Sequence, residues 1–425
     1  MQDGKRWALG ALAWASLVAV GLGACGGSGG SGGGSTGVGS GGTGVEAGSS
    51  GTTATQVTPS APGTPSAPTP ANPPSTSTPG GTTLLGNCEM FPAQAVFNTR
   101  VDDTARFPAH ASSAQWIASV GATRTFHADW WKGTDPTQPT AYYGMPVNSV
   151  DGTAATTDWP ILNYDFAASG VSSQSGWPHE SDCAVASGGG YTLTHNCAAV
   201  PTAQRRFPFP STNLLNEGGT CNDPNTCGDH HVLVVEQGAC RLWEAYAAYK
   251  LSGQWYAMST AAWDLKSLQL RPQTWTSGDA AGLPITPFLV KAAEANSGAI
   301  HHALRVTFRD AVLANTSTWP ARHAAGDATA GGIPFGALLR LRADFVIPST
   351  WTTQAKAIAT AAKQYGMYVA DIGSDFYVQG EPSAQWQDAT FSQLGSIPMS
   401  AMEFVDLRNV TNDPRWSVDS MAASW

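Results

Sequence analysis

Residues 228–246 have the sequence Gly-Asp-His-His-Val-Leu-Val-Val-Glu-Gln-Gly-Ala-Cys-Arg-Leu-Trp-Glu-Ala-Tyr, and this stretch decides the fold class. Two apolar runs, residues 231–236 and 240–246, flank a turn at Gly238. Short apolar runs on either side of a glycine turn are typical of a β-hairpin. The stretch therefore predicts a pair of antiparallel strands in the middle of the chain.

Further short apolar runs follow this hairpin, and each one predicts a strand. They are residues 255–265, 300–308, 338–347, 367–372 and 376–379. Only residues 352–365 have a clear helical spacing, which stops at Gly366, and a second, shorter helix is expected at 287–295. We therefore predict a mostly β fold, a β-sandwich-like or related all-β domain with long loops and one or two short helices.

The N-terminal 24 residues have the features of a secretory signal peptide. Lys5 and Arg6 precede an apolar stretch, residues 7–22, which is short for a membrane span. The sequence Leu-Gly-Ala before Cys25 resembles the bacterial lipoprotein box, in which cleavage precedes the cysteine and acyl chains anchor it to the membrane. Gly26 after the cysteine favours the outer membrane or cell surface, and the alternative is a plain signal peptide with an incidental Cys25.

Residues 25–84 are predicted to be a disordered tether, rich in glycine and serine at first and in proline later. The 425 residues include 47 Gly and 28 Pro, and a large share of these two residue types lies in this segment. The folded part is then a single extended β-rich domain, residues 85–425. Weak periodicity and many prolines make residues 85–217 a candidate looser lobe of it.

Six cysteines follow Cys25, an even number that indicates disulfide bonds in an exported chain. Proximity in the sequence favours the pairs Cys183–Cys197 and Cys221–Cys227, which leaves Cys88–Cys240. Residues 221–231 also bring thiols, a carboxylate and two histidines together, so a divalent metal such as zinc is the alternative there. That segment lacks the paired short cysteine spacing of structural zinc sites.

The composition and the motifs exclude several classes of function. A net charge of −9 argues against nucleic acid as a partner, because such binding needs a cationic footprint. Outside the Gly/Ser-rich segment, the sequence contains no Gly-x-Ser-x-Gly nucleophile elbow, His-Glu-x-x-His helix, P-loop or dinucleotide-binding glycine turn.

The hairpin concentrates the groups that offer acid and base chemistry. An odd hairpin register places His231 on the face of Glu244, whereas an even register places His230 there. A carboxyl group beside an imidazole can act as a general acid and base. The predicted catalytic residues are Glu244 and His231, supported by Asp229, Glu217, Asp279 and His302. The alternative is a half-buried ion pair that holds the hairpin together.

Carboxylates, histidines and 16 tryptophans together indicate carbohydrate chemistry, since flat rings stack on sugars and paired carboxylates hydrolyse glycosidic bonds. The candidate substrate-binding residues are Trp130, Trp131, Asp129, Trp275, Arg305 and His323, with Arg305 available to hold an anionic sugar. We expect a glycoside hydrolase or polysaccharide lyase acting on a polysaccharide or cell-envelope glycan. The alternative is a non-catalytic glycan-binding or structural lipoprotein.

Several blocks of the sequence are characteristic beyond their composition. They are Gly-Asp-His-His at 228–231, Cys-Arg-Leu-Trp-Glu at 240–244, Leu-Arg-Pro at 270–272, Trp-Thr-Ser-Gly-Asp-Ala-Ala-Gly-Leu-Pro-Ile at 275–285, His-Ala-Leu-Arg at 302–305, Ala-Arg-His at 321–323, Tyr-Gly-Met at 365–367 and Ala-Asp at 370–371. In these blocks the chain resembles a family of exported, secreted or lipid-anchored bacterial proteins. The resemblance implies one extended domain and a location outside the cytoplasm, and it implies no particular activity or catalytic residue.

Overall fold

The central hairpin forms as the sequence predicts. In the computed structural model, which describes residues 75–77, 83–328 and 330–424, β11 (Val232–Gln237) and β12 (Arg241–Tyr246) pair antiparallel. Leu233 lies opposite Glu244, so the register is odd and His231 falls on the same side of the hairpin as Glu244. The pairing leads into the turn at Gly238, which adopts a positive φ of 75°.

The hairpin is the centre of a four-stranded sheet that is buried on both faces. It adds β5 (Val147–Asp151) beside β11 in parallel and β15 (Ser259–Asp264) beside β12 antiparallel. Leu233 and Val235 belong to the larger hydrophobic core, whereas Val232 and Val234 belong to a second core on the opposite face. This double burial explains why the strand is a run of apolar residues rather than an alternation of apolar and polar ones.

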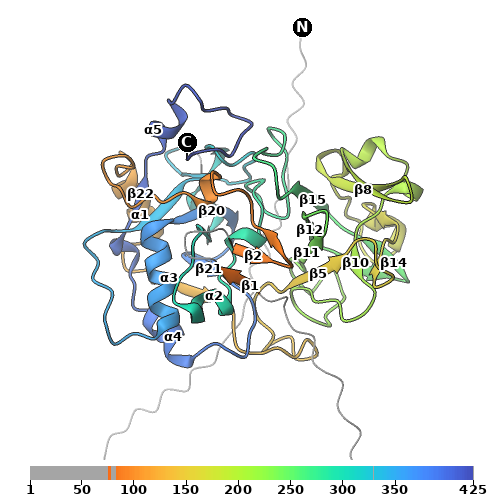
Figure 1. Ribbon diagram of the computed structural model, residues 1–425, viewed down its shortest axis with the longest axis horizontal. Coiled ribbons are helices and arrows are strands. Elements are labelled where there is room, and N and C mark those ends of the chain that lie inside the picture. The colour runs from red at the N-terminus through yellow and green to blue at the C-terminus, as the bar shows by residue number, and fades with distance from the viewer. Residues whose placement is uncertain (1–74, 78–82, 329, 425) are drawn as a thin grey trace, which may run out of the picture. The chain divides into compact units, whose positions relative to one another are not determined.

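A six-stranded mixed sheet forms the other side of the larger core. Its spatial order is β22 (Met402–Val405), β19 (Leu338–Leu341), β20 (Met367–Ile372), β16 (Leu304–Phe308), β21 (Tyr377–Gln379) and β4 (His127–Asp129). β16 is parallel to β20 and β21 is parallel to β4, while the other neighbours are antiparallel. Figure 1 shows helix α3 (Thr353–Gln364) alongside this sheet, where it contacts β19 and α2 (Ala292–Ser297).

The fold is mostly β, as predicted, with strand residues at 29% against 18% in helices. The predicted helix at 352–365 is confirmed as α3, in which the Thr352 hydroxyl caps the N-terminus by accepting a bond from the Ala355 amide. The prediction of one or two helices is too low for the described residues, because three more short ones are present. They are α1 (Ser113–Val120), α4 (Asp388–Leu394) and α5 (Arg408–Thr411).

Several smaller sheets complete the fold. Residues 83–424 all belong to one compact unit. These sheets are β7 (Leu162–Asn163) with β13 (Tyr249–Leu251) and β14 (Gln254–Tyr256), β6 (Thr157–Asp158) with β10 (Phe209–Pro210), β8 (Asp182–Ser187) with β9 (Gly190–His195), β17 (Leu313–Ser317) with β18 (Ile333–Phe335), and β1 (Ser75–Ser77) with β2 (Thr83–Leu85) and β3 (Cys88–Glu89).

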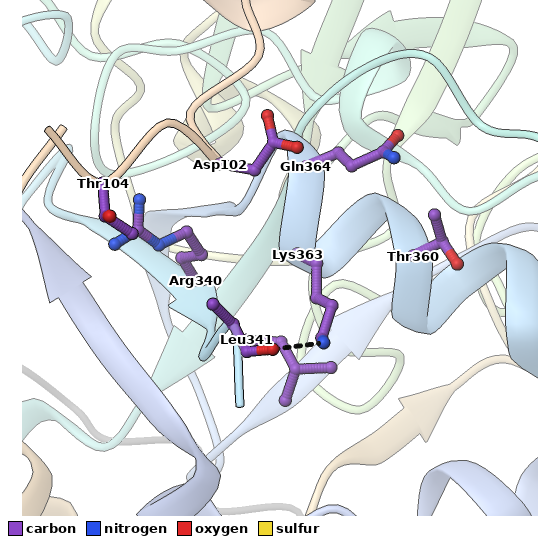
Figure 2. A pocket seen from close by; sticks show the side chains of 8 residues that line it. Asp102, Thr104, Arg340, Leu341, Thr360, Lys363 and Gln364 are labelled. Carbon is purple, nitrogen blue, oxygen red and sulfur yellow. Dashed lines mark hydrogen bonds between the residues drawn. The ribbon is translucent and has the colours of Figure 1, made fainter. Parts of the chain in front are cut away.

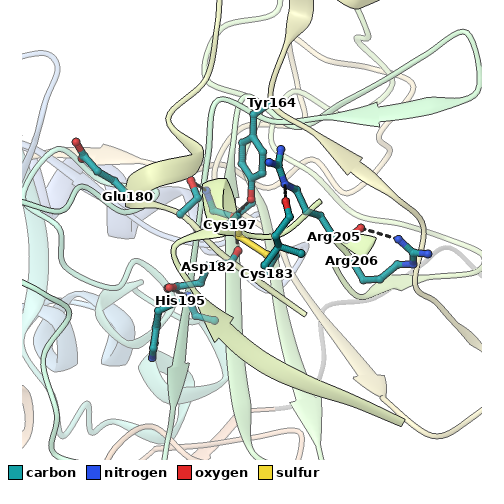
Figure 3. The surroundings of a disulfide bond; sticks show 12 residues. Tyr164, Glu180, Asp182, Cys183, His195, Cys197, Arg205 and Arg206 are labelled. Atoms are coloured by element: carbon teal, nitrogen blue, oxygen red, sulfur yellow. Dashed lines mark hydrogen bonds and ion pairs between the residues drawn. A yellow bond between two sulfur atoms is a disulfide. The ribbon is translucent and has the colours of Figure 1, made fainter. Parts of the chain in front are cut away.

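A buried carboxylate of strand β8, Asp182, joins that strand to the four-stranded sheet. Asp182 is fully buried beside the Cys183–Cys197 bond and lies next to His195, to which it is bonded (Figure 3). It also binds the guanidinium of Arg271 and accepts a hydrogen bond from the Ala262 amide of β15 at 2.8 Å. A carboxylate in the core needs such partners, because an unpaired buried charge is costly.

All three predicted disulfides are present: Cys88–Cys240, Cys183–Cys197 and Cys221–Cys227. They indicate an oxidising compartment outside the cytoplasm. Because Cys221 and Cys227 are bonded to each other, their thiols are not available to a metal, and the zinc alternative for this segment loses its ligands. Within the described part of the chain, no group of three or more His, Cys, Asp or Glu side chains is arranged to hold a metal ion.

The predicted signal peptide, Cys25 and nearly all of the predicted tether lie outside the described residues. Among the helices that the structure describes, none has the length and apolar character needed to cross a membrane.

We predict that the Cys88–Cys240 bond carries the largest share of disulfide stabilisation. It closes a loop of 152 residues, and removing it with Cys88→Ser and Cys240→Ser is expected to lower the free energy of unfolding by about 2–5 kcal/mol in urea denaturation. The matched control is Cys221→Ser with Cys227→Ser, which opens a loop of only 6 residues and should cost less. Equal losses in the two double variants would contradict the loop-length argument.

Candidate functional site: a carboxyl cluster around two buried cations

His231 and Glu217 form a close pair at the open end of the hairpin. Nδ1 of His231 lies 2.7 Å from Oε2 of Glu217, and the backbones of the two residues are also bonded, with the Glu217 amide 3.0 Å from the His231 carbonyl oxygen. His231 is buried, whereas the side chain of Glu217 is 28% exposed. The pair therefore presents a carboxylate to solvent and keeps its cation inside.

Both ring nitrogens of His231 donate hydrogen bonds. Nδ1 faces the Glu217 carboxylate, and Nε2 lies 2.9 Å from the carbonyl oxygen of Gly278, which can only accept. A Cβ at position 278 would lie only 2.9 Å from Ile285 Cδ1, so the glycine allows Ile285 to pack closely against the backbone that accepts the His231 bond. A histidine whose two partners are both acceptors carries both protons and is an imidazolium.

The charges of this pair stabilise each other. Burial alone lowers the pKa of His231, but the charge and hydrogen bond of Glu217 outweigh it and raise the pKa to about 10. Burial likewise favours the neutral form of Glu217, yet the imidazolium of His231 holds the pKa of Glu217 below its usual range. Glu217 is therefore an ionised, partly exposed base at neutral pH.

A second pair of carboxyl groups surrounds the other buried cation, Arg305. Nη2 of Arg305 donates to Oδ1 of Asp279 and lies 3.6 Å from Oδ2 of Asp371, which stands at the C-terminal end of β20. Asp279 and Arg305 are buried, but the Asp371 side chain is 20% exposed. Burial and the charge of Asp279 raise the pKa of Asp371 to about 7.

Asp371 and Asp279 are neighbouring carboxyl groups that have the same cation, Arg305, as their partner. Oδ2 of Asp279 is buried and has no hydrogen-bond partner among the described residues. Burial also raises the pKa of Asp279 to about 6, against the opposing charge of Arg305. The raised pKa values favour a proton on one of these neighbouring carboxyl groups near neutral pH, and Asp371 is the member that solvent reaches.

Asp229 lies close enough to both pairs to be affected by their charges. Burial of its carboxyl group and the charge of Glu217 raise the pKa of Asp229 to about 6, and Asp371 adds to the shift. The hydroxyl of Tyr246 hydrogen-bonds Asp229, and the Tyr246 ring lies 5.5 Å from that of His231. Three solvent-accessible carboxyl groups, Glu217, Asp229 and Asp371, thus surround the same two buried cations.

Glu244 and His302 are both enclosed in the protein interior, Glu244 beneath the cluster next to Gly278 and His302 beside Glu294. Glu244 is fully buried and accepts hydrogen bonds from the amides of Ile285 and Thr286, at 2.9 and 2.8 Å. Burial raises its pKa. His302 is buried against Glu294, with Nε2 3.2 Å from Oε2. The structure therefore corrects the predicted centre, because neither side chain is accessible and the imidazole of His231 binds Glu217 instead of Glu244.

Several predicted substrate-binding residues are also not accessible. Trp130 is completely buried between Trp386 and Phe391, so it has no free ring face. Arg305 is sealed in its pair with Asp279, which corrects the expectation that it is free to bind an anionic sugar. Trp275 is half-buried, and the guanidinium of Arg271 covers its ring at 5.5 Å.

Three other predicted residues remain at the surface near the cluster. Trp131 is 43% exposed, and its amide donates to the carbonyl oxygen of Tyr143, which is 44% exposed. The Tyr143 hydroxyl binds Asp129, and Asp129 is close enough to Glu217 for each charge to affect the other. His323 is half-buried and donates through Nδ1 to the carbonyl oxygen of Ala280, 2.7 Å away.

Sequence reasoning did not identify Asp371, Tyr143 or Tyr246 as site residues. Asp371 ends a predicted strand, and a polar residue at that position is ordinary. One signal was available, because Asp371 belongs to one of the characteristic blocks, Ala-Asp at 370–371.

A separate pocket of about 240 Å³ lies where α3 meets β19 (Figure 2). Its cations are already engaged: Lys363 donates to the carbonyl oxygens of Ala343 and Phe345, and Arg340 donates to Glu403 and to the Val101 and Phe107 carbonyls. No charged group of this pocket is left for a ligand, so the carboxyl cluster is the better candidate site.

Comparison with known proteins gives no relative to guide this assignment. No protein-family model matches the sequence, and no curated protein or solved structure is significantly similar to it. The assignment of function therefore depends on the geometry of the cluster.

We predict that His231 stays doubly protonated well into the alkaline range. Since its folded pKa of about 10 exceeds the unfolded value of about 6.5, its contribution to stability is complete below the unfolded value and is lost as the pH rises toward the folded one. Histidine-ring ¹⁵N NMR near pH 8 should show two protonated nitrogens for His231 and a neutral ring for His127, whose pKa burial lowers. A neutral His231 at that pH would refute the ion pair.

Proposed function

We propose that this protein is a lipid-anchored, extracytoplasmic enzyme that cleaves a polysaccharide by acid/base chemistry. The observation that carries the proposal is a pair of partly exposed carboxyl groups in one cluster, Glu217 against the buried His231 and Asp371 against the buried Arg305. Their surroundings shift the two pKa values in opposite directions, below the usual range for Glu217 and up to about 7 for Asp371. A pair of carboxyl groups kept in different states is what glycosidic bond cleavage requires.

Exposed aromatic rings beside the cluster support a carbohydrate substrate. The exposed Tyr143 binds Asp129 through its hydroxyl, and Asp129 is close enough to Glu217 to be affected by its charge. The exposed Trp131 is bonded to Tyr143 through its backbone amide. Trp177 is 38% exposed and stacks on Tyr246, which binds Asp229. Flat apolar ring faces next to polar groups suit the faces of sugar rings.

The catalytic assignment predicts that Glu217→Gln and Asp371→Asn each lower polysaccharide cleavage by about 100-fold or more. The assay is the release of new reducing ends or unsaturated products from a panel of polysaccharides by the purified full-length protein. Controls of the same chemistry at exposed positions, Glu89→Gln and Asp388→Asn, should keep full activity. Circular dichroism should confirm that each variant is folded, since Glu217→Gln removes the anion of His231.

Binding of a glycan without turnover by the wild type would favour the alternative, a non-catalytic glycan-binding or envelope-structural lipoprotein. Wild-type activity that both carboxyl variants retain would place the chemistry at another site.

The pH dependence of the activity follows from the same two groups. The rate should fall as the pH rises through about 7, because Asp371 then loses the proton that it donates. It should fall on the acid side only below the usual range of a glutamate, because His231 keeps Glu217 ionised. A pH–rate profile of wild-type kcat/KM tests both limbs, and a rate that still increases above neutrality would contradict the role of Asp371 as the acid.

Anchoring is proposed to occur through acyl chains on Cys25. Cys25→Ala should move the protein from the membrane fraction to the soluble fraction when it is expressed in a bacterium, because the anchor requires that thiol. Ser28→Ala, three residues further on, is the control and should stay with the membrane. A Cys25→Ala protein that remains membrane-bound would refute the lipoprotein proposal.

A further inference from the structure

The titratable groups that the carboxyl cluster presents to solvent are all acidic. Glu217 and Asp371 are partly exposed and Asp229 is exposed. The two cations that balance them, His231 and Arg305, are both 1% exposed. A ligand at this site meets the carboxyl groups, and the protein covers the positive charges.

The buried cations offer no accessible donor to a ligand. Both N–H groups of His231 are bonded to Glu217 and Gly278. Arg305 directs Nη2 to Asp279 and Nη1 to the sulfur of Met145 at 3.4 Å, and its Nε is enclosed without a partner among the described residues. An anionic group of a substrate reaches neither side chain, because each is 1% exposed and paired with a carboxylate.

Neighbouring cationic side chains do not change this picture. His323 lies beside Asp371 through Ala280, but its Nδ1–H is engaged by the Ala280 carbonyl oxygen. Burial lowers the pKa of His127, which stacks on the ring of Tyr377. Lys132 is paired with Asp388, with Nζ 2.9 Å from Oδ1.

We infer that the substrate is a neutral or amine-bearing polysaccharide and that its glycosidic bond is hydrolysed rather than eliminated. This inference rests on the proposed function and specifies its substrate and reaction. An anionic sugar would place its carboxylate against Glu217 and Asp229, and like charges in contact disfavour binding strongly. Elimination from a uronic acid also needs a cation at the sugar carboxylate to stabilise the carbanion, and the cluster offers none that is accessible.

The groups present balance a hydrolysis without any further reactant. The oxygen of a water molecule bonds to the anomeric carbon as the bond from that carbon to the glycosidic oxygen breaks. Glu217 takes the proton of the water, and Asp371 gives its proton to the departing oxygen. One bond to oxygen replaces another and no group is oxidised. The proton on Glu217 then returns through solvent to Asp371, so both carboxyl groups regain their starting states.

The inference is tested by comparing three kinds of polysaccharide with purified full-length protein: neutral glucans, xylans and galactans, the amine-bearing chitosan, and the uronates polygalacturonate and alginate. New reducing ends are measured together with the ultraviolet absorbance of unsaturated products. We expect reducing ends from a neutral or amine-bearing chain, no unsaturated product, and a kcat/KM at least about tenfold lower for any uronate.

Each other result has a distinct meaning. Unsaturated products from a uronate, or hydrolysis that favours a uronate, would overturn this inference and leave polysaccharide cleavage by the cluster intact. No cleavage of any glycan would instead overturn the proposed function itself.

A charge variant tests the electrostatic cause separately. Asp229→Asn removes one accessible negative charge, so it should reduce the discrimination against uronates, measured as the ratio of binding constants for a neutral and an anionic oligosaccharide. Asp158→Asn, at an exposed position in β6, is the control and should leave that ratio unchanged. An unchanged ratio in Asp229→Asn would show that the acidic surface does not set the substrate class.

Discussion

The double burial of the β11–β12 hairpin is the constraint on which the rest of the structure depends. Because one face packs into the larger core and the other into the second core, every polar group on it must find a partner inside the protein. The amides of Ile285 and Thr286 satisfy Glu244, and Glu217 with Gly278 satisfies His231. These bonds position the loops on either side, and the carboxyl cluster is assembled from those loops together with Arg305 of β16 and Asp371 of β20.

Local patterns in the sequence were sufficient for much of the fold. Gly238 between two apolar runs gave the hairpin, Gly366 after a helical pattern gave the end of α3, and the strand at 367–372 was predicted at its observed bounds. The parallel pairing of β16 with β20 could not be foreseen, because the two strands are far apart in the sequence and their neighbours are chosen by packing. Helices α1 and α4 carry no side-chain cap that would have announced them.

The site was foreseen in its components and not in its pairing. Glu217, Asp229, His231 and Asp279 were named from the sequence, and the structure places all four in one cluster. The partner of His231 was predicted from the hairpin register alone. The register cannot show that a loop carrying Glu217 lies beside His231 and that Glu217 forms the hydrogen bond with its ring. Trp130 shows the opposite limit, because a tryptophan next to an exposed one gives no local sign that it is buried.

If the protein is anchored through its N-terminal end, as proposed, the Cys88–Cys240 bond has a mechanical consequence. Tension applied through that end enters the fold near β2 and β3 and crosses directly from Cys88 to the hairpin at Cys240. The chain between the two cysteines is a covalently closed loop, so such tension cannot draw it out. Glu217, Asp229 and His231 all lie within that loop, whereas the residues that follow Cys240 have no such protection.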